Sequence, residues 1–173
     1  DAIEASYRML SPQDQAALAT LSVVEGPFRG AAAESLLGSG SHESLQALCD
    51  QSLVQVASDD EGQRFSLLGS VRAFAAARLD ASSSFEAYQR LAHHYLVAAE
   101  AQACAAEDWP NLMRADAWFE EQSRKGEALR LAQAMAGLSE RWGRMREALA
   151  RLDRLEPPSD AREWAPWCTA RGR

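Results

Sequence analysis

Features that would place this chain of 173 residues in a membrane or in a secreted fold are scarce. It has no apolar run of about 18 residues, the length that spans a membrane, and no basic-then-apolar leader that would mark a secretory signal. Its three cysteines, Cys49, Cys104 and Cys168, are odd in number and widely spaced. That pattern favours buried thiols in a reducing compartment over a disulfide framework. We therefore expect a cytoplasmic protein with no membrane contact.

Positive charge is also scarce, and its distribution is uneven. The chain has 25 acidic and 18 basic side chains, a net charge of −7, and Lys125 is its single lysine. Between Arg29 and Arg64 there is no Lys or Arg, whereas six acidic residues lie in that interval. Because phosphate binding requires clustered Lys and Arg, this acidic balance disfavours a nucleic-acid-binding surface.

The first part of the chain has the order of elements typical of a winged-helix module. Helical spacing predicts helices over residues 11–21 and 29–37, with Ser11 as the N-cap of the first. A third helix is expected to begin at a cap, Ser41. Alternating apolar residues on either side of the turn formers at 58–62 then predict a β-hairpin, the only strand signal in the chain. Helical spacing returns over residues 67–79.

The second part is expected to be entirely helical. The polar segment 81–84 separates the two parts, and Ser83 with Glu86 has the spacing of a capping box. Apolar positions then recur in helices of about a dozen residues with short connectors, which favours a tetratricopeptide-like array. A last helix carrying Trp164 and Trp167 follows Pro158. Since no further repeat would cover it, we expect the chain to be a piece of a longer protein.

These patterns predict a mainly α fold with two domains. Residues 1–80 would form a winged-helix domain with one small hairpin, and residues 81–173 a helical tetratricopeptide-like domain truncated at its C-terminal end.

No constellation of residues points to catalysis. The chain has neither a G-x-x-x-x-G-K phosphate loop nor a G-x-S-x-G elbow. His93 and His94 are adjacent, so on a helix they point about 100° apart and cannot readily chelate one metal. We expect one histidine to pack near Tyr95 and the other to face water. The sequence thus predicts no catalytic, cofactor-binding or metal-ligating residue, and a protein that is not itself an enzyme.

Two charged regions allow more than one interpretation. A winged helix often reads DNA, but here the third helix and the wing are acidic and would be repelled by phosphates. Residues 124–154 have the opposite bias, with eight basic and four acidic side chains. One interpretation is a basic stripe that binds an acidic partner surface or a phosphate. The other is a solvated face with local ion pairs, such as Glu147 with Arg151. We favour the second interpretation.

Several motifs of the chain follow a pattern known from one family: LSPQDQAAL from residue 10, LQAL and DQSLV from residues 45 and 50, RFSLL from residue 64, VR and FAAARL from residues 71 and 74, and RLAHHYL from residue 90. They resemble the winged-helix region of bacterial STAND-type signalling ATPases, the large ATP-binding transcriptional regulators that include LuxR-type members. The resemblance covers roughly residues 4–155 and is most specific in the winged helix.

The resemblance implies a regulatory role. In such proteins a nucleotide-binding domain precedes the winged helix, which acts as a lid and relay, and helical repeats follow that receive an effector or partner. ATP or ADP would bind on that upstream domain, and no cofactor is expected in this chain. Related ATPases often touch ADP through the His of a Met-His-Asp motif, but the matching positions here are Leu67, Leu68 and Gly69.

We accordingly single out Leu68, Gly69 and Arg72 as a possible contact with the upstream domain, while Arg72 could equally be paired locally. The expected partners are that domain and an unknown effector or protein on the helical array, with no direct nucleic acid. The alternative is a DNA-binding winged-helix repressor with a helical dimerisation domain. A further alternative, an enzyme of unrecognised type, would need a pocket that gathers His93, His94 and acidic residues.

Overall fold

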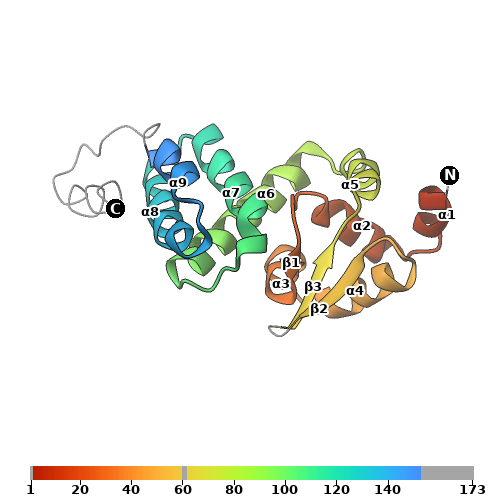
Figure 1. Ribbon diagram of the computed structural model, residues 1–173. Helices are drawn as coiled ribbons and strands as arrows, with labels where there is room; N and C mark the ends of the chain where they lie inside the picture. The colour runs from red at the N-terminus through yellow and green to blue at the C-terminus, as the bar shows by residue number, and fades with distance from the viewer. Residues whose placement is uncertain (1, 60–61, 153–173) are drawn as a thin grey trace.

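The computed structural model of this chain describes residues 2–59 and 62–152, and most of these residues lie in helices around a small sheet (Figure 1). The sheet is antiparallel with the strand order β1-β3-β2. The mainly α fold class with a small hairpin is therefore confirmed. The elements are α1 (Ala2–Arg8), α2 (Pro12–Leu21), β1 (Phe28–Arg29), α3 (Gly30–Leu37), α4 (Ser41–Asp50), β2 (Gln55–Asp59), β3 (Gly62–Ser66), α5 (Gly69–Ala76), α6 (Ala81–Glu100), the 3-10 helix η1 (Ala106–Asp108), α7 (Trp109–Glu121), α8 (Lys125–Trp142) and α9 (Met145–Leu152).

The helices of the winged-helix part begin close to where local signals predict. At α2 the Ser11 hydroxyl accepts a hydrogen bond from the backbone N–H of Asp14 at 3.1 Å, so Ser11 is the N-cap. At α4 the prediction is wrong by one position. Gly40 is the N-cap, with a positive φ of 88°, and Ser41 is the first helical residue. The left-handed backbone there suits glycine, which has no Cβ to clash.

The sheet contains a strand that the sequence pattern does not reveal. The predicted hairpin is present as β2 and β3, but β1 pairs with the other edge of β3, with Phe28 opposite Phe65 and Arg29 opposite Arg64. Two residues are too few to show the alternation that marks a strand. Phe28 is fully buried, and its ring centroid lies 5.9 Å from that of Phe65, so burial of this pair holds β1 in place.

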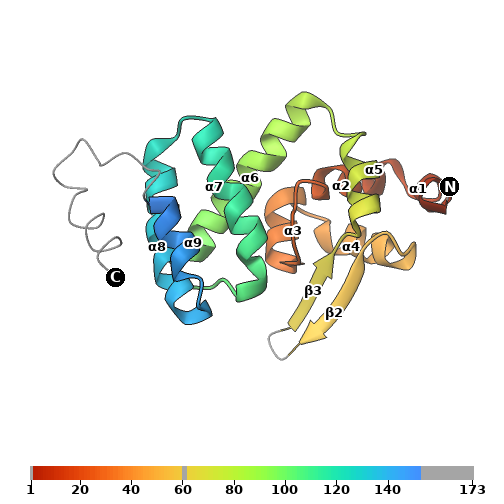
Figure 2. The same cartoon turned by 45° about the horizontal axis from the view of Figure 1, so that its top comes forward.

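The long helix α6 joins the two parts of the molecule. Its N-cap is Asp80, whose carboxylate accepts hydrogen bonds from the N–H groups of Ser82 and Ser83, both at 3.0 Å. The predicted capping box of Ser83 with Glu86 is therefore wrong, because the helix begins earlier. In both views α6 lies between the winged-helix elements and the helices α7 to α9 (Figures 1 and 2), and it packs on α2, α3, α7 and α8.

One hydrophobic core runs through both parts, from Leu10 to Leu138. The boundary at residue 80 stays a prediction, since buried side chains are continuous across it.

The helix expected after Pro158 and the thiol of Cys168 lie outside the described residues. Helix α1 had no counterpart in the predictions. No helix in residues 2–59 and 62–152 combines the length and the apolar character that crossing a bilayer requires.

Candidate functional site: the junction of the winged helix with the helical array

The side chain of Asn111, near the start of α7, holds the loop that follows α2. Its oxygen accepts hydrogen bonds from the backbone N–H groups of Glu25 at 2.8 Å and Gly26 at 3.1 Å. Its NH₂ group donates to the carbonyl oxygen of Pro27 at 2.8 Å and to the hydroxyl of Tyr95 at 3.0 Å. The four bonds use both acceptor sites and both donors of this fully buried amide, and they determine which way the amide is turned.

The loop and α7 approach so closely that a side chain at Gly26 would be crowded. A Cβ at that position would lie 3.1 Å from Cγ of Pro110 and 3.2 Å from its Cβ. The hydroxyl of Tyr95 comes from α6 and is also buried, and burial raises the pKa of this phenol well above its usual range. The Tyr95 phenol therefore stays neutral at all physiological pH values, and its hydrogen bond with Asn111 joins α6 to α7 and the loop.

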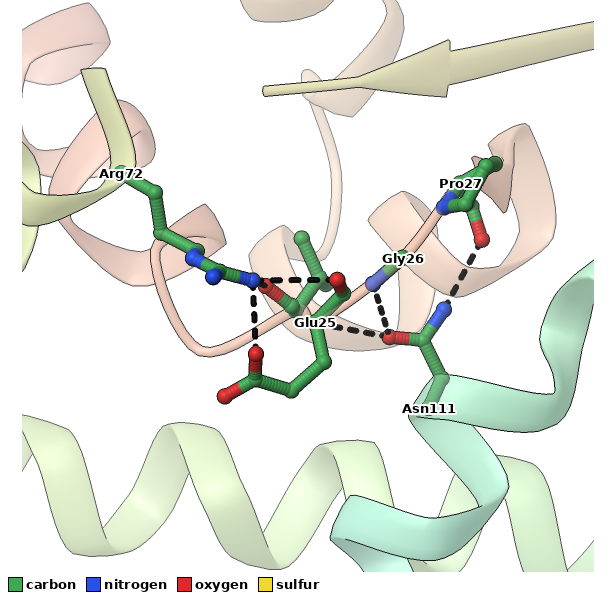
Figure 3. A network of polar contacts seen from close by, with 6 residues as sticks. Glu25, Gly26, Pro27, Arg72 and Asn111 are labelled. Carbon is green, nitrogen blue, oxygen red and sulfur yellow. Dashed lines mark hydrogen bonds and ion pairs between the residues drawn. The ribbon is translucent and has the colours of Figure 1, made fainter. Parts of the chain in front are cut away.

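Arg72 extends the network to α5. Its guanidinium donates hydrogen bonds to the carbonyl oxygens of Val24 at 3.3 Å and Glu25 at 3.0 Å, and to the Glu25 carboxylate at 2.6 Å (Figure 3). The Arg72 side chain is 33% exposed, so solvent reaches the pair but does not surround it. Of the two sequence interpretations of this arginine, local pairing is what the described residues show.

The other two residues of the predicted contact do not join this network. Leu68 is the N-cap residue of α5 and is half exposed, and Gly69 is the exposed first residue of that helix. Both are thus placed at the surface beside Arg72. Contact of Leu68 and Gly69 with an upstream domain stays a prediction.

A second link joins the wing to the array. Arg64 of β3 and Asp108 of η1 are both more than nine-tenths buried, with their charged atoms 3.7 Å apart, and Glu107 lies 3.6 Å from the same guanidinium. The Asp108 carboxylate also accepts a hydrogen bond from the N–H of Ala105 at 2.9 Å. Burial raises the pKa of Asp108, although the bond from Ala105 and the charges of Arg64 and Arg29 act in the opposite direction.

The helix that would enter a DNA groove presents acidic groups outward. The inner face of α4 buries Ser44, Leu45 and Leu48. The exposed side chains of α4 are those of His42, Glu43, Gln46 and Asp50, so its outward face has two carboxylates and no Lys or Arg. The amide of Gln46 donates a hydrogen bond to the Asp50 carboxylate at 2.8 Å.

Within the described part of the basic stretch, residues 124–152, Arg124 pairs locally with Glu127 at 3.2 Å, whereas Arg130 pairs with Glu100 of α6 at 2.7 Å. The predicted local pair of Glu147 with Arg151 is wrong. Glu147 pairs with Arg144 at 3.3 Å, whereas Arg151 is buried and contacts Asp116 and Glu120 on α7. Tertiary packing brings α7 and α9 together and so offers Arg151 a buried partner that outcompetes an exposed neighbour on its own helix.

The two adjacent histidines are packed rather than aimed at a common point. His94 lies edge-on to Tyr95 with ring centroids 5.0 Å apart, and its Nδ1 is 2.8 Å from the Ser35 hydroxyl. Burial lowers the pKa of His94. His93 does not simply face water as expected, because its ring packs against Phe119. Within the described residues no group of three or more His, Cys, Asp or Glu side chains is arranged to hold a metal ion.

Sequence reasoning missed Asn111, Asp108 and Arg64, which make the junction. A signal did exist for the first: the chain has one asparagine, and it lies on the apolar stripe that Leu112, Ala115 and Phe119 define on α7. A polar residue on a buried stripe requires hydrogen-bond partners. The partners themselves come from loops that the pattern cannot place.

Comparison with known protein families identifies the first part of the chain. Residues 10–80 match the model of the winged helix-turn-helix domain family. This segment is therefore a winged-helix domain, of a class that serves regulation or DNA binding. Comparisons with curated proteins and with solved structures give no match.

Proposed function

We propose that this chain is a non-catalytic regulatory segment of a cytoplasmic STAND-type ATPase transcriptional regulator. In this proposal the winged helix is a relay that packs on an upstream nucleotide-binding domain, and the helical array receives an effector or a partner protein. The nucleotide, ATP or ADP, would be held by the upstream domain. The observation that carries the proposal is the outward face of α4, which has two carboxylates and no Lys or Arg.

The charge of that face argues against the usual role of such a helix. DNA affinity depends on Lys and Arg side chains, which displace the counterions bound to the phosphates. Each additional phosphate contact makes the binding constant fall more steeply with salt concentration. Arg64, the first cation after Arg29, is buried against Asp108 and Glu107 and points into the molecule. The junction supports a relay, because Asn111 and the Arg64–Asp108 pair join the winged helix to the array by buried polar contacts.

A DNA-binding repressor remains the second candidate, favoured by the family match and by the accessibility of α4. Fluorescence anisotropy with a random duplex of about 25 base pairs, at about 50 and about 200 mM salt, separates the two. We expect no salt-sensitive binding by the natural chain. Tight, salt-sensitive binding would overturn the proposal.

A charge-reversed variant provides the positive control for this measurement. The double substitution Glu43→Lys and Asp50→Lys places two cations on the exposed face of α4, so it is expected to create weak, salt-sensitive duplex binding. If this variant binds and the natural chain does not, charge rather than geometry keeps the winged helix from DNA.

The relay is tested with the segment encoded upstream in the same gene. The proposal expects a G-x-x-x-x-G-K loop there, and expects the purified upstream segment to bind this chain in the presence of ADP. Leu68→Asp should weaken that binding. Val97→Asp is the control, because Val97 is also an exposed apolar residue but lies elsewhere, on α6, and this substitution should leave the binding unchanged. Absence of the loop, or equal effects of the two variants, would contradict the relay.

A further inference from the structure

Strand β2 forms a free edge of the sheet, and Figure 2 shows it as the outer strand of the hairpin. Its inner edge pairs with β3, from Gln55 opposite Ser66 to Asp59 opposite Gly62. Among the described residues no strand lies along its outer edge, and no backbone hydrogen bond from outside the hairpin reaches residues 55–58. Alternate residues of an antiparallel strand direct their N–H and C=O groups away from the partner strand. The outer edge of β2 therefore presents unpaired backbone donors and acceptors.

The usual protections of a sheet edge are absent from the described part of β2. Residues 55–58 are all exposed, so no helix or loop of the described chain covers them. The segment QVAS has no Lys or Pro, and its register with β3 continues without a bulge. The opposite edge of the sheet differs, because β1 has two residues and continues directly into α3. Of the two edges, β2 is therefore the one at which another strand can be added.

The surroundings of β2 are acidic. The interval between Arg29 and Arg64 has six acidic residues and no Lys or Arg. Asp50 ends α4, so only the segment 51–54 separates it from β2, and Glu43 is exposed on the same helix. Arg64, on the neighbouring strand, is buried against two carboxylates of η1 and does not offset this charge at the surface. A strand added to β2 thus meets a surface that favours Lys and Arg side chains.

We propose that the outer edge of β2 binds an extended, basic segment of a partner protein, which adds a strand to the three-stranded sheet. The backbone hydrogen bonds provide affinity, and the Lys or Arg side chains of the partner lie near the acidic groups around the wing. Val56 is half exposed and offers an apolar contact to a side chain of the added strand. This interaction goes beyond the proposed function, because it requires neither the upstream domain nor the helical array.

Charge distinguishes this occupant from a second copy of the chain. Pairing the β2 edges of two copies would bring two acidic intervals together, each with no Lys or Arg in residues 30–63. Like charges on adjacent strands destabilise the pairing. A basic segment meets the opposite charge and is therefore the favoured occupant.

The test uses as its probe a synthetic peptide of about eight residues, the length of a typical strand, in which Lys and Val alternate and both ends are blocked. Calorimetry and hydrogen exchange follow its binding to this chain. We expect saturable binding that weakens about fivefold when the salt rises from about 50 to about 200 mM. Exchange should slow at alternate amides of residues 55–58, those that face outward, because the inward amides are already bonded to β3.

Two further peptides separate strand addition from non-specific attraction. The Lys–Val peptide N-methylated at every residue keeps its charge but loses its backbone donors, so it should not bind. A peptide of alternating Glu and Val keeps the donors but has the wrong charge, so it should not bind either.

A pair of double variants tests the role of the acidic surface. Glu43→Gln with Asp50→Asn removes the two carboxylates of α4 and should weaken binding about fivefold. The matched control is Glu86→Gln with Glu100→Gln, which removes two exposed carboxylates of α6 and should leave binding unchanged.

Several results would overturn the proposal. They are the absence of saturable binding of the Lys–Val peptide up to about 1 mM, equal binding of either control peptide, and an equal loss of affinity in the two double variants. Sedimentation of the chain alone tests the second copy, since a dimer that Val56→Lys dissociates would assign this edge to self-association instead. None of these measurements uses duplex DNA or the upstream segment, so failure of this proposal and failure of the proposed function are distinguishable.

Discussion

The side-chain oxygen of Asn111 accepts a hydrogen bond from the backbone N–H of Glu25, a residue 86 positions earlier in the chain. Asn111 belongs to the first turn of α7, and Glu25 to the loop that leads from α2 into β1. A fully buried side chain from the array thus replaces water at backbone groups of the winged helix. The winged helix and the array are thereby joined through a specific polar contact as well as through apolar packing.

Replacing Asn111 should loosen this junction. Asn111→Ala leaves the N–H groups of Glu25 and Gly26 and the carbonyl of Pro27 without their partner, at a cost of about 3 kcal/mol in the free energy of unfolding. Urea denaturation measures the loss, and hydrogen exchange should show faster exchange at those two amides. The control is Gln46→Ala on the exposed face of α4. Unchanged exchange at Glu25 and Gly26 would show that the contact is not needed.

The Arg72–Glu25 pair should contribute less, because it is half exposed. A double-mutant cycle with Arg72→Met and Glu25→Gln is expected to give a coupling free energy of about 0.5–1 kcal/mol. Arg72→Met alone should cost more than Glu25→Gln, since Arg72 also donates to two backbone carbonyls that survive the glutamate substitution. Equal single effects would mean that those carbonyl bonds contribute nothing.

The buried contact of Arg151 with Asp116 should be the most sensitive point of the array. Arg151→Met leaves the Asp116 carboxylate buried without its cation, which is expected to cost about 3–5 kcal/mol in unfolding free energy. Arg146→Met, at an exposed site on the same helix, should change it by less than about 0.5 kcal/mol. A double variant, Arg151→Met with Asp116→Leu, should recover most of the loss. Chemical denaturation followed by circular dichroism measures all three.

Asp80 should make the stability of α6 depend on acid pH. Hydrogen bonds from Ser82 and Ser83 lower the pKa of this N-cap carboxyl below its ordinary value of 3.8. A lowered pKa in the folded state means that stability is present above pH 3.8 and is lost as the pH falls toward the folded value, because the unfolded chain takes up the proton first.

The two substitutions at Asp80 separate capping from titration. Asp80→Ala removes the cap and should lower the melting temperature at every pH. Asp80→Asn keeps a capping oxygen, so it should preserve stability near neutral pH while weakening the acid dependence. Thermal melts from about pH 7 down to about pH 2 make the comparison, because the expected loss lies below the ordinary pKa of the carboxyl. An acid dependence that is identical in Asp80→Asn would assign it to other carboxyls.

Local signals explain which elements could be predicted. The helices of the winged-helix part and the hairpin follow from apolar spacing and from caps such as Ser11, which act over a few residues. The two-residue strand β1 was missed because its stability comes from pairing with β3 and from burial of Phe28. The cap of α6 was misassigned because several serines competed with Asp80 for that role, and local spacing alone does not rank them.

By itself the sequence determined the mainly α fold class, the winged-helix order of the first part and the acidic character of the helix that would face DNA. Each of these depends on spacing or on charge within a short segment. Only the tertiary structure decided that Asn111 holds Gly26 and that Arg64 meets Asp108. These contacts join residues far apart in the chain, and their partners exist only once packing of the core has brought α6, α7 and the sheet together.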